Sequence, residues 1–449
     1  MSGSDLTGLG LRLLLSNFWK TVGRQMWAAL LQLGTVVLIA RAYGPQGNGL
    51  YSVALLLPAM LALLLALGIG AANVYYLASR RYSLRAVTST TLRLWAVLAL
   101  IGLAGGLLVV RFYADRLFPD VPALTLYITL LAFPPMLFVT LVGSLFQGVE
   151  DFSSFNLSLS LQPALSLLGI VFCVLAGFSA SHAVGAYVVG SGGASLALAW
   201  RLHGKLATAP GEGPVRPYPV SEALSYGVRS HLGSILAFLN LRIDLFLLNF
   251  FTSPVLAGIY VVALQLAERI WMLSQAVTTV LLPRLSSLAK DGTRSMALLA
   301  LASRMTLLAT LLMTVVAAAI GMKLITWLFG VSYQSAYIPF LIMLPGILAG
   351  SCVRILAAEF SSRGRPELNT YLAFVVVAVG VLCNIVLIPR HGAVGAALSS
   401  SIAYVVSLLI RLVMYRRFVG QSALNLLVPK YSDVAALLGH LKDGRVPKS

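Results

Sequence analysis

The stretch Leu94-Trp-Ala-Val-Leu-Ala-Leu-Ile-Gly-Leu-Ala-Gly-Gly-Leu-Leu-Val-Val110 contains no charged residue and lies between Arg93 and Arg111. A helix of about twenty such residues, rising about 1.5 Å per residue, crosses the roughly 30 Å hydrocarbon core of a bilayer. Similar apolar runs recur along the whole chain. This pattern predicts an all-α membrane protein whose chain crosses the bilayer many times.

The composition excludes a water-soluble fold. Of the 449 residues, 59% are hydrophobic and 10% are charged, and the mean hydropathy is +0.91. Soluble domains carry roughly 25% charged residues, so this chain lacks the polar residues that a water-facing surface requires. The apolar runs predict about twelve membrane spans. These spans lie at residues 24–43, 50–78, 94–112, 123–146, 154–177, 183–202, 231–251, 258–282, 305–328, 336–358, 369–388 and 392–414.

The longest polar interruption divides the predicted spans equally. It contains the turn-forming sequence Ala209-Pro-Gly-Glu-Gly-Pro-Val-Arg-Pro-Tyr-Pro219, which is typical of a linker. The sequence therefore predicts two halves of about six helices each around a central cleft. The expected organisation is a cytoplasmic N-terminal segment at 1–23, a first half at 24–202, a cytoplasmic linker at 203–230, a second half at 231–414 and a cytoplasmic tail at 415–449.

Two short motifs occur once in each half. Gly44-Pro-Gln-Gly-Asn-Gly-Leu-Tyr51 recurs as Ser253-Pro-Val-Leu-Ala-Gly-Ile-Tyr260, and His182-Ala-Val-Gly-Ala186 recurs at nearly the same spacing as Gly392-Ala-Val-Gly-Ala396. These matches indicate an internal duplication. Because an even number of spans returns the chain to its starting side, the halves are expected to share one orientation and to be related by an axis along the membrane normal. Halves of this kind can rock about a shared cleft, which is transporter architecture.

The formal net charge of +18 suggests a nucleic-acid partner, but the positions of the basic residues argue against one. Most Lys and Arg residues fall in the N-terminal segment, the linker, the tail and alternate loops. The opposite side holds Arg41, Arg111, Arg116, Lys323 and Arg390. Cytoplasmic loops of membrane proteins are enriched in Lys and Arg. We therefore expect both termini in the cytoplasm, the lipid bilayer as a partner, and no nucleic acid.

The chain has no recognisable enzyme motif. Cys173, Cys352 and Cys383 lie singly in apolar runs, without the spacing of a metal site or a disulfide framework. The sequence contains neither a phosphate-binding loop with Gly-Lys-Ser/Thr nor a nucleophile elbow. These observations predict a protein that is not an enzyme and that carries no cofactor and no metal.

Ionisable side chains within membrane spans are costly and normally face a bundle interior or a wet cavity. The candidate basic residues are Arg24, Arg41, Arg242, Arg269 and Arg354, and the candidate acidic residues are Asp244, Glu268 and Glu359. Polar residues also follow one face of the eighth predicted span, at Gln265, Glu268, Met272, Gln275 and Thr279.

Two interpretations of these charges remain open. Arg242 and Arg269 can pair with Asp244 or Glu268 as structural locks between helices. Alternatively, several arginines in one cleft leave a net positive charge, and the planar guanidinium fork suits an anionic group such as a pyrophosphate. Asp244, Glu268 and Glu359 are then candidates for ion coupling or for salt bridges.

Several segments resemble one family. Ile39–Tyr51, Arg242–Leu248, Thr252–Tyr260 and Asn384–Ala397 look like segments of the Wzx-type polysaccharide-biosynthesis flippases, in the multidrug/oligosaccharidyl-lipid/polysaccharide exporter superfamily. The resemblance implies a bacterial inner-membrane flippase that moves a polyprenyl-pyrophosphate-linked oligosaccharide from the cytoplasmic to the outer leaflet. It implies a role in O-antigen, capsule or exopolysaccharide synthesis, with a polysaccharide polymerase and chain-length machinery as partners. The five arginines are the residues here that suit the family's cationic cleft.

Two other functions compete with this interpretation. A multidrug cation antiporter of the same superfamily would use a cleft carboxylate, such as Asp244 or Glu268, to exchange an ion for drug. A membrane glycan polymerase or ligase would be an enzyme on similar spans, but such enzymes generally place catalytic residues in a large outer loop. The predicted outer loops are short, the longest lying near Arg111 to Pro122.

Overall fold

The computed structural model describes residues 3–208, 216–288, 292–365, 367–419 and 424–428. Across these residues the chain is helical between short turns and contains no strand. The centre of the predicted linker and the end of the predicted tail lie outside the described residues. An all-helical chain is the physical consequence of the apolar sequence, because a helix satisfies its own backbone hydrogen bonds in lipid.

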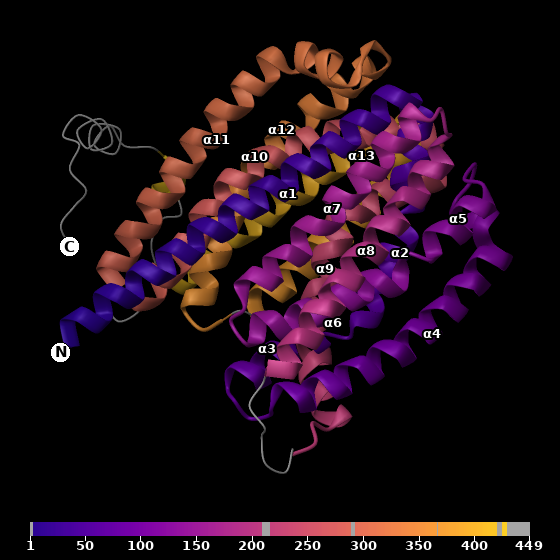
Figure 1. The fold of residues 1–449 in the computed structure, drawn as a ribbon. Coiled ribbons are helices and arrows are strands. Elements are labelled where there is room, and N and C mark those ends of the chain that lie inside the picture. Colours follow the sequence, from indigo (N-terminus) through magenta and orange to yellow (C-terminus); the bar gives the residue numbers. More distant parts are fainter. Residues whose placement is uncertain (1–2, 209–215, 289–291, 366, 420–423, 429–449) are drawn as a thin grey trace. The chain divides into compact units, whose positions relative to one another are not determined.

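The chain divides into two compact units, the first formed by residues 1–261 with 328–332. Its helices run in the order shown in Figure 1. They are α1 (Gly3–Ala54), α2 (Leu56–Ala66), α3 (Ile69–Ala78), α4 (Leu84–Leu117), α5 (Ala123–Leu130), α6 (Phe133–Gly148), α7 (Phe152–Leu175), α8 (Ala180–Thr208) and α9 (Val220–Phe251).

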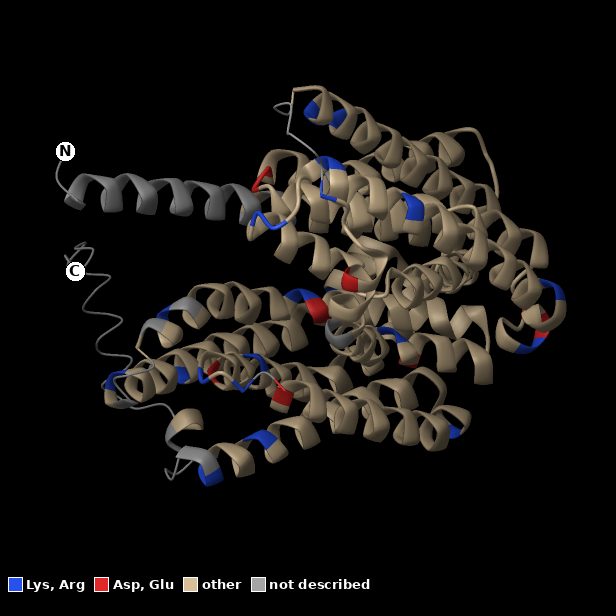
Figure 2. Cartoon of the chain, turned by 90° about the horizontal axis from the view of Figure 1, so that it is seen from below, with Lys and Arg blue, Asp and Glu red and all other residues tan. Residues whose placement is uncertain are grey.

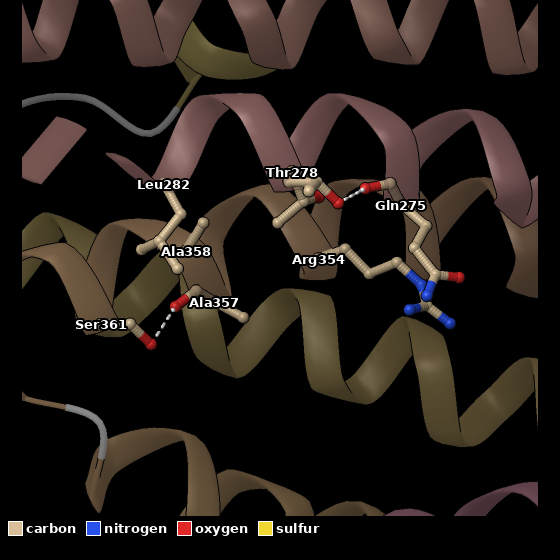
Figure 3. Close-up of a pocket in the computed structure, with 8 residues that line it drawn as sticks. Gln275, Thr278, Leu282, Arg354, Ala357, Ala358 and Ser361 are labelled. Atoms are coloured by element: carbon tan, nitrogen blue, oxygen red, sulfur yellow. Dashed lines mark hydrogen bonds between the residues drawn. The ribbon is translucent and has the colours of Figure 1, made fainter. Parts of the chain in front are cut away.

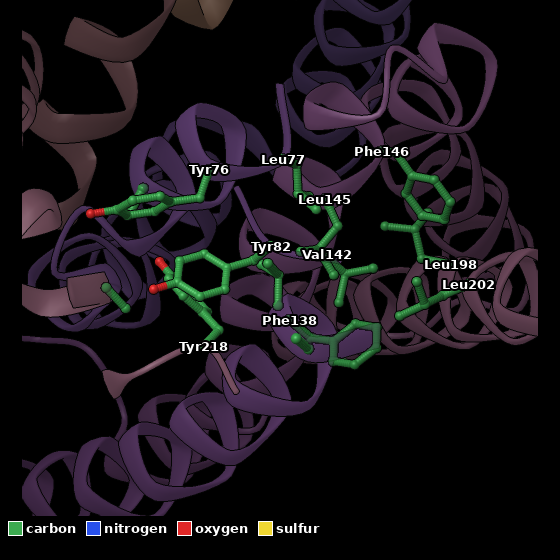
Figure 4. Close-up of a cluster of buried hydrophobic side chains, with 14 residues drawn as sticks. Tyr76, Leu77, Tyr82, Phe138, Val142, Leu145, Phe146, Leu198, Leu202 and Tyr218 are labelled. Carbon is green, nitrogen blue, oxygen red and sulfur yellow. The ribbon is translucent and has the colours of Figure 1, made fainter. Parts of the chain in front are cut away.

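Helix α6 forms the centre of the first unit, because it contacts α2, α3, α4, α7 and α8. Phe133, Leu137, Leu141 and Leu145 follow one another at intervals of four residues, and all four are buried. Positions four apart share one face of a helix, so this row is the face against which the neighbouring helices pack. Figure 4 shows the part of this core that includes Leu145 and the tyrosines beside it.

The second unit comprises residues 262–327 with 333–449. Its helices are the main part of α10 (Pro254–Ser287), α11 (Gly292–Phe329), the short 3-10 helix η1 (Val331–Ala336), which starts in the first unit, α12 (Tyr337–Ser362), α13 (Glu367–Val419) and α14 (Leu424–Leu427). Helices α10 to α14 each contribute to one cluster, made of Leu281, Leu285, Leu299, Ile355, Leu356, Tyr415 and Leu426. Helices α12 and α13 also pack closely against each other.

The two longest apolar helical stretches are each interrupted at a glycine. By length and hydropathy, ten helical stretches of the described chain qualify as spans, the longest being Met26–Ala66 and Glu367–Arg417. Each of these two contains a glycine with a non-helical backbone, Gly44 (φ 65°) and Gly392 (φ 54°). Both stretches are thus interrupted within their length, and the ten stretches of the described chain are close to the predicted number of about twelve spans. The predicted polytopic α-helical class is confirmed.

Much of the helical surface is apolar and exposed. Leu175 is 83% exposed, Trp200 74% and Trp327 70%, values that suit side chains facing lipid. Figure 2 shows correspondingly long stretches of ribbon without a charged residue.

The two copies of the first repeated motif contact each other within the first unit. A Cβ atom placed on Gly49 would lie 1.6 Å from the carbonyl oxygen of Pro254, and one placed on Gly258 would lie 2.0 Å from that of Pro45. The Asn48 side chain also donates a hydrogen bond of 2.9 Å to the carbonyl oxygen of Gly258. The contact is reciprocal, because Pro45 and Gly49 occupy the same motif positions as Pro254 and Gly258.

Candidate functional site

A pocket of about 520 Å³ lies between α10 and α12 in the second unit. Its size falls within the range of roughly 300–1,000 Å³ that is common for ligand sites. The residues around it include one cation and several small polar side chains (Figure 3). They are Gln275, Thr278, Thr279 and Leu282 on α10, and Arg354, Ala357, Ala358 and Ser361 on α12.

Arg354 is held in place by an aromatic ring. Its guanidinium carbon lies 5.0 Å from the centroid of the Trp271 ring, within cation–π range. The Trp271 indole donates a 2.9 Å hydrogen bond to the carbonyl oxygen of Ile347 and packs edge-on against Tyr404. Gly350 permits this arrangement, because a Cβ atom there would lie 2.8 Å from the indole. The arginine is therefore oriented without a salt bridge having to hold it.

The α10 side of the pocket supplies hydrogen-bonding groups. Gln275 and Thr279 are four residues apart and therefore share a face of the helix, with Thr278 beside them. The Thr278 and Thr279 hydroxyls donate to the carbonyl oxygens one turn earlier, at 2.5 Å and 2.8 Å. In Figure 3 the polar ends of Gln275 and Arg354 point into the same part of the pocket. A guanidinium group with a nearby amide N–H group can bind the oxygens of a phosphate.

A polar network supports the α12 side. The Asn369 amide donates to the carbonyl oxygen of Ala357 at 3.0 Å and to the Ser361 hydroxyl at 3.1 Å. Its oxygen accepts a 2.6 Å hydrogen bond from Arg411, which is only 5% exposed. The network fixes α13 against the end of α12 on which Ser361 sits.

The other predicted charges of the second unit lie on the same two helices. Arg269 on α10 donates a 3.0 Å hydrogen bond to Gln265, one turn earlier. Glu268 on α10 is close enough to act electrostatically on Arg354. Glu359 on α12 is fully buried and forms a 2.5 Å salt bridge with Arg363. A buried carboxylate with an arginine partner has the geometry of a structural pair.

The first unit contains the remaining predicted charges. Arg41 on α1 is exposed and donates a 2.7 Å hydrogen bond to the carbonyl oxygen of Leu328. Arg242 on α9 is half-buried, and one of its terminal nitrogens donates to the carbonyl oxygen of Leu241 at 3.0 Å. Asp244 is 4% exposed and accepts hydrogen bonds from the Tyr260 hydroxyl and the Leu245 amide. Arg24 lies on α1, and its side chain is outside the described part of the chain.

The structure thus assigns the predicted charges to two units. Arg41, Arg242 and Asp244 belong to the first unit, and Glu268, Arg269, Arg354 and Glu359 belong to the second. Sequence reasoning identified Arg354, and it identified Gln275 and Thr279 through their helical spacing. It missed Thr278 and Ser361 because a lone hydroxyl residue in an apolar helix commonly bonds its own backbone and carries no further signal.

Comparison with known proteins gives a family and a fold. The model of a family described as "Polysaccharide biosynthesis protein" matches residues 14–289, which is more than half of the chain. No curated protein matches the sequence.

Solved structures share the fold at low sequence identity. The lipid II flippase MurJ in an inward closed conformation has a TM-score of 0.75 at 15% identity, over 95% of this chain and 93% of that one. An inward-facing multidrug resistance MATE family transporter has a TM-score of 0.69 at 16% identity, over 88% and 94%. A transporter of the MOP superfamily from Pyrococcus furiosus has a TM-score of 0.63 at 15% identity, over 89% and 96%.

Proposed function

Because the chain belongs to the polysaccharide biosynthesis protein family, we propose that it is a flippase for a polyprenyl-pyrophosphate-linked oligosaccharide. It moves this lipid from the cytoplasmic to the outer leaflet of a bacterial cytoplasmic membrane by alternating access. The glycan serves synthesis of a cell-surface polysaccharide such as O-antigen, capsule or exopolysaccharide. A polysaccharide polymerase and chain-length machinery act on the product.

The pocket around Arg354 is the observation that carries this proposal. The guanidinium group, oriented on Trp271, binds the pyrophosphate, and the Gln275 amide donates a further hydrogen bond to it beside the small side chains of Thr278 and Thr279. Arginine suits this task because its planar fork contacts two phosphate oxygens at once. The lipid chain remains in the bilayer, so the protein has to enclose only the polar headgroup.

The other predicted arginines assist in this proposal. Arg24, Arg41, Arg242 and Arg269 are further candidates for binding the anionic headgroup, whereas Arg354 contacts the pyrophosphate directly. A carrier of this kind forms and breaks no covalent bond, so we propose that the protein is not an enzyme.

The first test replaces Arg354 by Met, which keeps an apolar side chain against Trp271 and removes the charge. Flipping is measured in proteoliposomes as the movement of a fluorescent polyprenyl-pyrophosphoryl glycan into the leaflet reached by a membrane-impermeant quencher. We expect Arg354→Met to reduce the rate per folded protein at least tenfold, and Arg354→Lys to retain part of it. Arg416→Ala removes an exposed cation of α13 and is the matched control.

Unchanged flipping by Arg354→Met at normal folding would overturn the role of this pocket. A further Arg242→Ala and Arg269→Ala double variant tests the assisting charges. If this double variant is present at normal abundance and flips the lipid at the normal rate, Arg242 and Arg269 do not take part in transport.

One observation favours a second candidate, a multidrug cation antiporter. Asp244 is a buried carboxylate, and an ionisable residue at membrane depth is a candidate for ion coupling. In that case the wild type transports drug in exchange for a cation and shows no detectable flipping of the lipid-linked glycan. Asp244→Asn then abolishes the drug transport. Glu268 is tested by the same replacement with Gln.

A further inference from the structure

A second cavity, of about 600 Å³, lies within the first unit between α3, α6, α7 and α9. None of the residues that line it is charged. Its polar and aromatic side chains are Tyr75, Thr140, Ser144, Gln147, Phe155 and Tyr226. A site of this composition selects neither anions nor cations, so its chemistry differs from that of the Arg354 pocket.

The aromatic wall results from a close helix crossing. The break between α2 and α3 at Gly68 allows α9 to approach, because a Cβ atom on Gly68 would lie 2.1 Å from the carbonyl oxygen of Gly227. One residue before that crossing, Tyr226 stacks on Tyr75, with ring centroids 4.8 Å apart and planes at 17°. The Tyr75 side chain remains 48% exposed and that of Tyr226 36%. Both tyrosines of the stacked pair line the cavity and remain partly exposed.

The opposite wall is a polar row on α6. Thr140, Ser144 and Gln147 are separated by four and three residues, so they share one face of the helix. Two hydrogen bonds hold the Ser144 side chain in place. Its hydroxyl accepts one of 3.1 Å from Asn73 and donates one of 2.6 Å to the carbonyl oxygen of Leu141. Asn73 is fully buried and also accepts from Thr91. Gln147 is exposed, and its amide offers both donors and an acceptor.

An aromatic wall that faces a row of neutral hydrogen-bonding groups suits a sugar ring. One face of a pyranose is formed by polarised C–H groups that pack against the negative face of an aromatic ring. Its hydroxyl groups are both donors and acceptors, as are hydroxyl and amide side chains. A hydrocarbon tail over this lining would displace water from the Gln147 amide and leave that amide without a hydrogen-bond partner, which costs free energy. A phosphate would find no cation in this lining.

We propose that this cavity binds a sugar ring of the lipid-linked oligosaccharide. The inference rests on the proposed function, and it divides recognition of one substrate between two sites. The Arg354 pocket takes the pyrophosphate that all such lipids share, whereas the cavity of Tyr75, Tyr226 and Gln147 discriminates between glycans.

The test measures binding of two lipids to the purified full chain in nanodiscs. One is polyprenyl pyrophosphate without sugar, and the other carries an oligosaccharide. Gln147→Leu with Thr140→Val removes two hydrogen-bonding groups at similar side-chain size. We expect this double variant to bind the sugar-bearing lipid about tenfold more weakly, which corresponds to about 1.4 kcal/mol, and the bare lipid with unchanged affinity. Tyr226→Leu should show the same selective loss.

The controls separate this inference from the proposed function. Arg354→Met should weaken both lipids equally, and Tyr371→Leu, which changes an exposed tyrosine of α13, should weaken neither. If the wild type binds both lipids equally and the double variant changes nothing, the sugar site is wrong and the flippase proposal stands.

If the wild type binds neither lipid, the flippase proposal fails, and a second measurement decides the cavity alone. A Gln147→Cys variant is labelled with a maleimide in the presence of glucose, galactose or N-acetylglucosamine at high concentration. Slower labelling with any of them than without sugar supports the sugar site, and a labelling rate that none of the three changes overturns it.

Discussion

Asp151 connects local helix chemistry to the packing of the first unit. Its carboxylate accepts a 3.1 Å hydrogen bond from the Ser154 amide, which caps α7, and a 2.8 Å salt bridge from Lys205 on α8. Desolvation on burial raises the pKa of this carboxyl group, but the hydrogen bonds from Lys205 and Ser154 outweigh it and hold the pKa below its ordinary value. The carboxylate is therefore stabilising in its charged form.

We expect Asp151→Ala to destabilise the protein by about 1 kcal/mol at neutral pH, because it removes the cap. The salt bridge is partly exposed and adds little. Since the folded pKa is depressed, this stabilisation is complete above the unfolded value of about 3.9 and is lost as the pH falls through the lower folded value. Thermal unfolding of the wild type and of Asp151→Ala at pH 7 and pH 3 should show that the difference in stability becomes smaller at pH 3. A larger difference at pH 3 would contradict the depressed pKa of Asp151.

The reciprocal contact of Gly49 and Gly258 makes a second prediction at this scale. A methyl group at either position meets a backbone carbonyl oxygen, which cannot rotate away, so Gly49→Ala and Gly258→Ala should each cost about 2 kcal/mol or more. Gly185→Ala is the control, because nothing lies within 4 Å of its added Cβ atom. Thermal unfolding in detergent measures both effects. Equal stability of the three variants would show that the two backbones lie further apart at this crossing than these distances indicate.

At the scale of elements, the beginning of α9 is fastened to the loop between α3 and α4. Glu222 accepts hydrogen bonds from Arg81 at 3.1 Å and from the Tyr82 hydroxyl at 3.0 Å. The Tyr82 ring packs against that of Tyr218, as Figure 4 shows, with centroids 5.0 Å apart. Thr90 on α4 donates a 2.7 Å hydrogen bond to the carbonyl oxygen of Tyr218. These contacts attach the end of the linker to the first unit.

Loss of Glu222 should loosen this attachment. Since Arg81 is 46% exposed, the ionic part is screened, and we expect an effect of about 1 kcal/mol for Glu222→Ala. That free energy corresponds to a roughly fivefold larger open population. Trypsin cleavage after Arg81, in the loop that Glu222 holds, should accelerate by the same factor. Glu150→Ala changes an exposed carboxylate elsewhere and should leave the cleavage rate unchanged.

The positions of the helices could be predicted from sequence, but their interruptions could not. The apolar runs located the spans because lipid requires about twenty such residues per crossing. The span expected at 50–78 is divided between α2 and α3 by Leu67 and Gly68, both with positive φ. Glycine is common in membrane helices as a packing residue, so the sequence does not distinguish Gly68 at a break from Gly70 within α3. The break nevertheless allows the helix crossing beside the cavity that Tyr75 and Tyr226 line.

At the scale of the whole molecule, the sequence predicted the charged residues but not their grouping. A soluble helix shows its buried face by hydrophobic periodicity, whereas a membrane helix faces lipid that is as apolar as its neighbours. The rotation of α9 and of α12 was therefore undetermined. Arg242 and Arg354 consequently looked equivalent in the sequence, although Arg242 bonds a backbone carbonyl of its own helix and Arg354 lines a polar pocket.

The orientation of the chain in the membrane is the last prediction, and it follows from the uneven distribution of Lys and Arg. A reporter that functions only in the cytoplasm should work when fused after Arg365 and fail when fused within residues 252–258. Control fusions with a reporter that functions only outside should give the opposite result. Activity of the cytoplasmic reporter at both positions would mean that an even number of spans, and not the predicted three, lies between them.

The reciprocal crossing of Pro45–Tyr51 with Pro254–Tyr260 has one more consequence. In a homodimer, an interface on a twofold axis uses the same surface patch of each subunit, and each residue meets the counterpart of its own neighbour. Gly49 beside Pro254 and Gly258 beside Pro45 obey that rule inside a single polypeptide. The two motif copies thus contact each other as the two sides of a twofold interface would. Asn48 now stands where the other copy has Ala257, so only one side of the crossing donates the side-chain hydrogen bond.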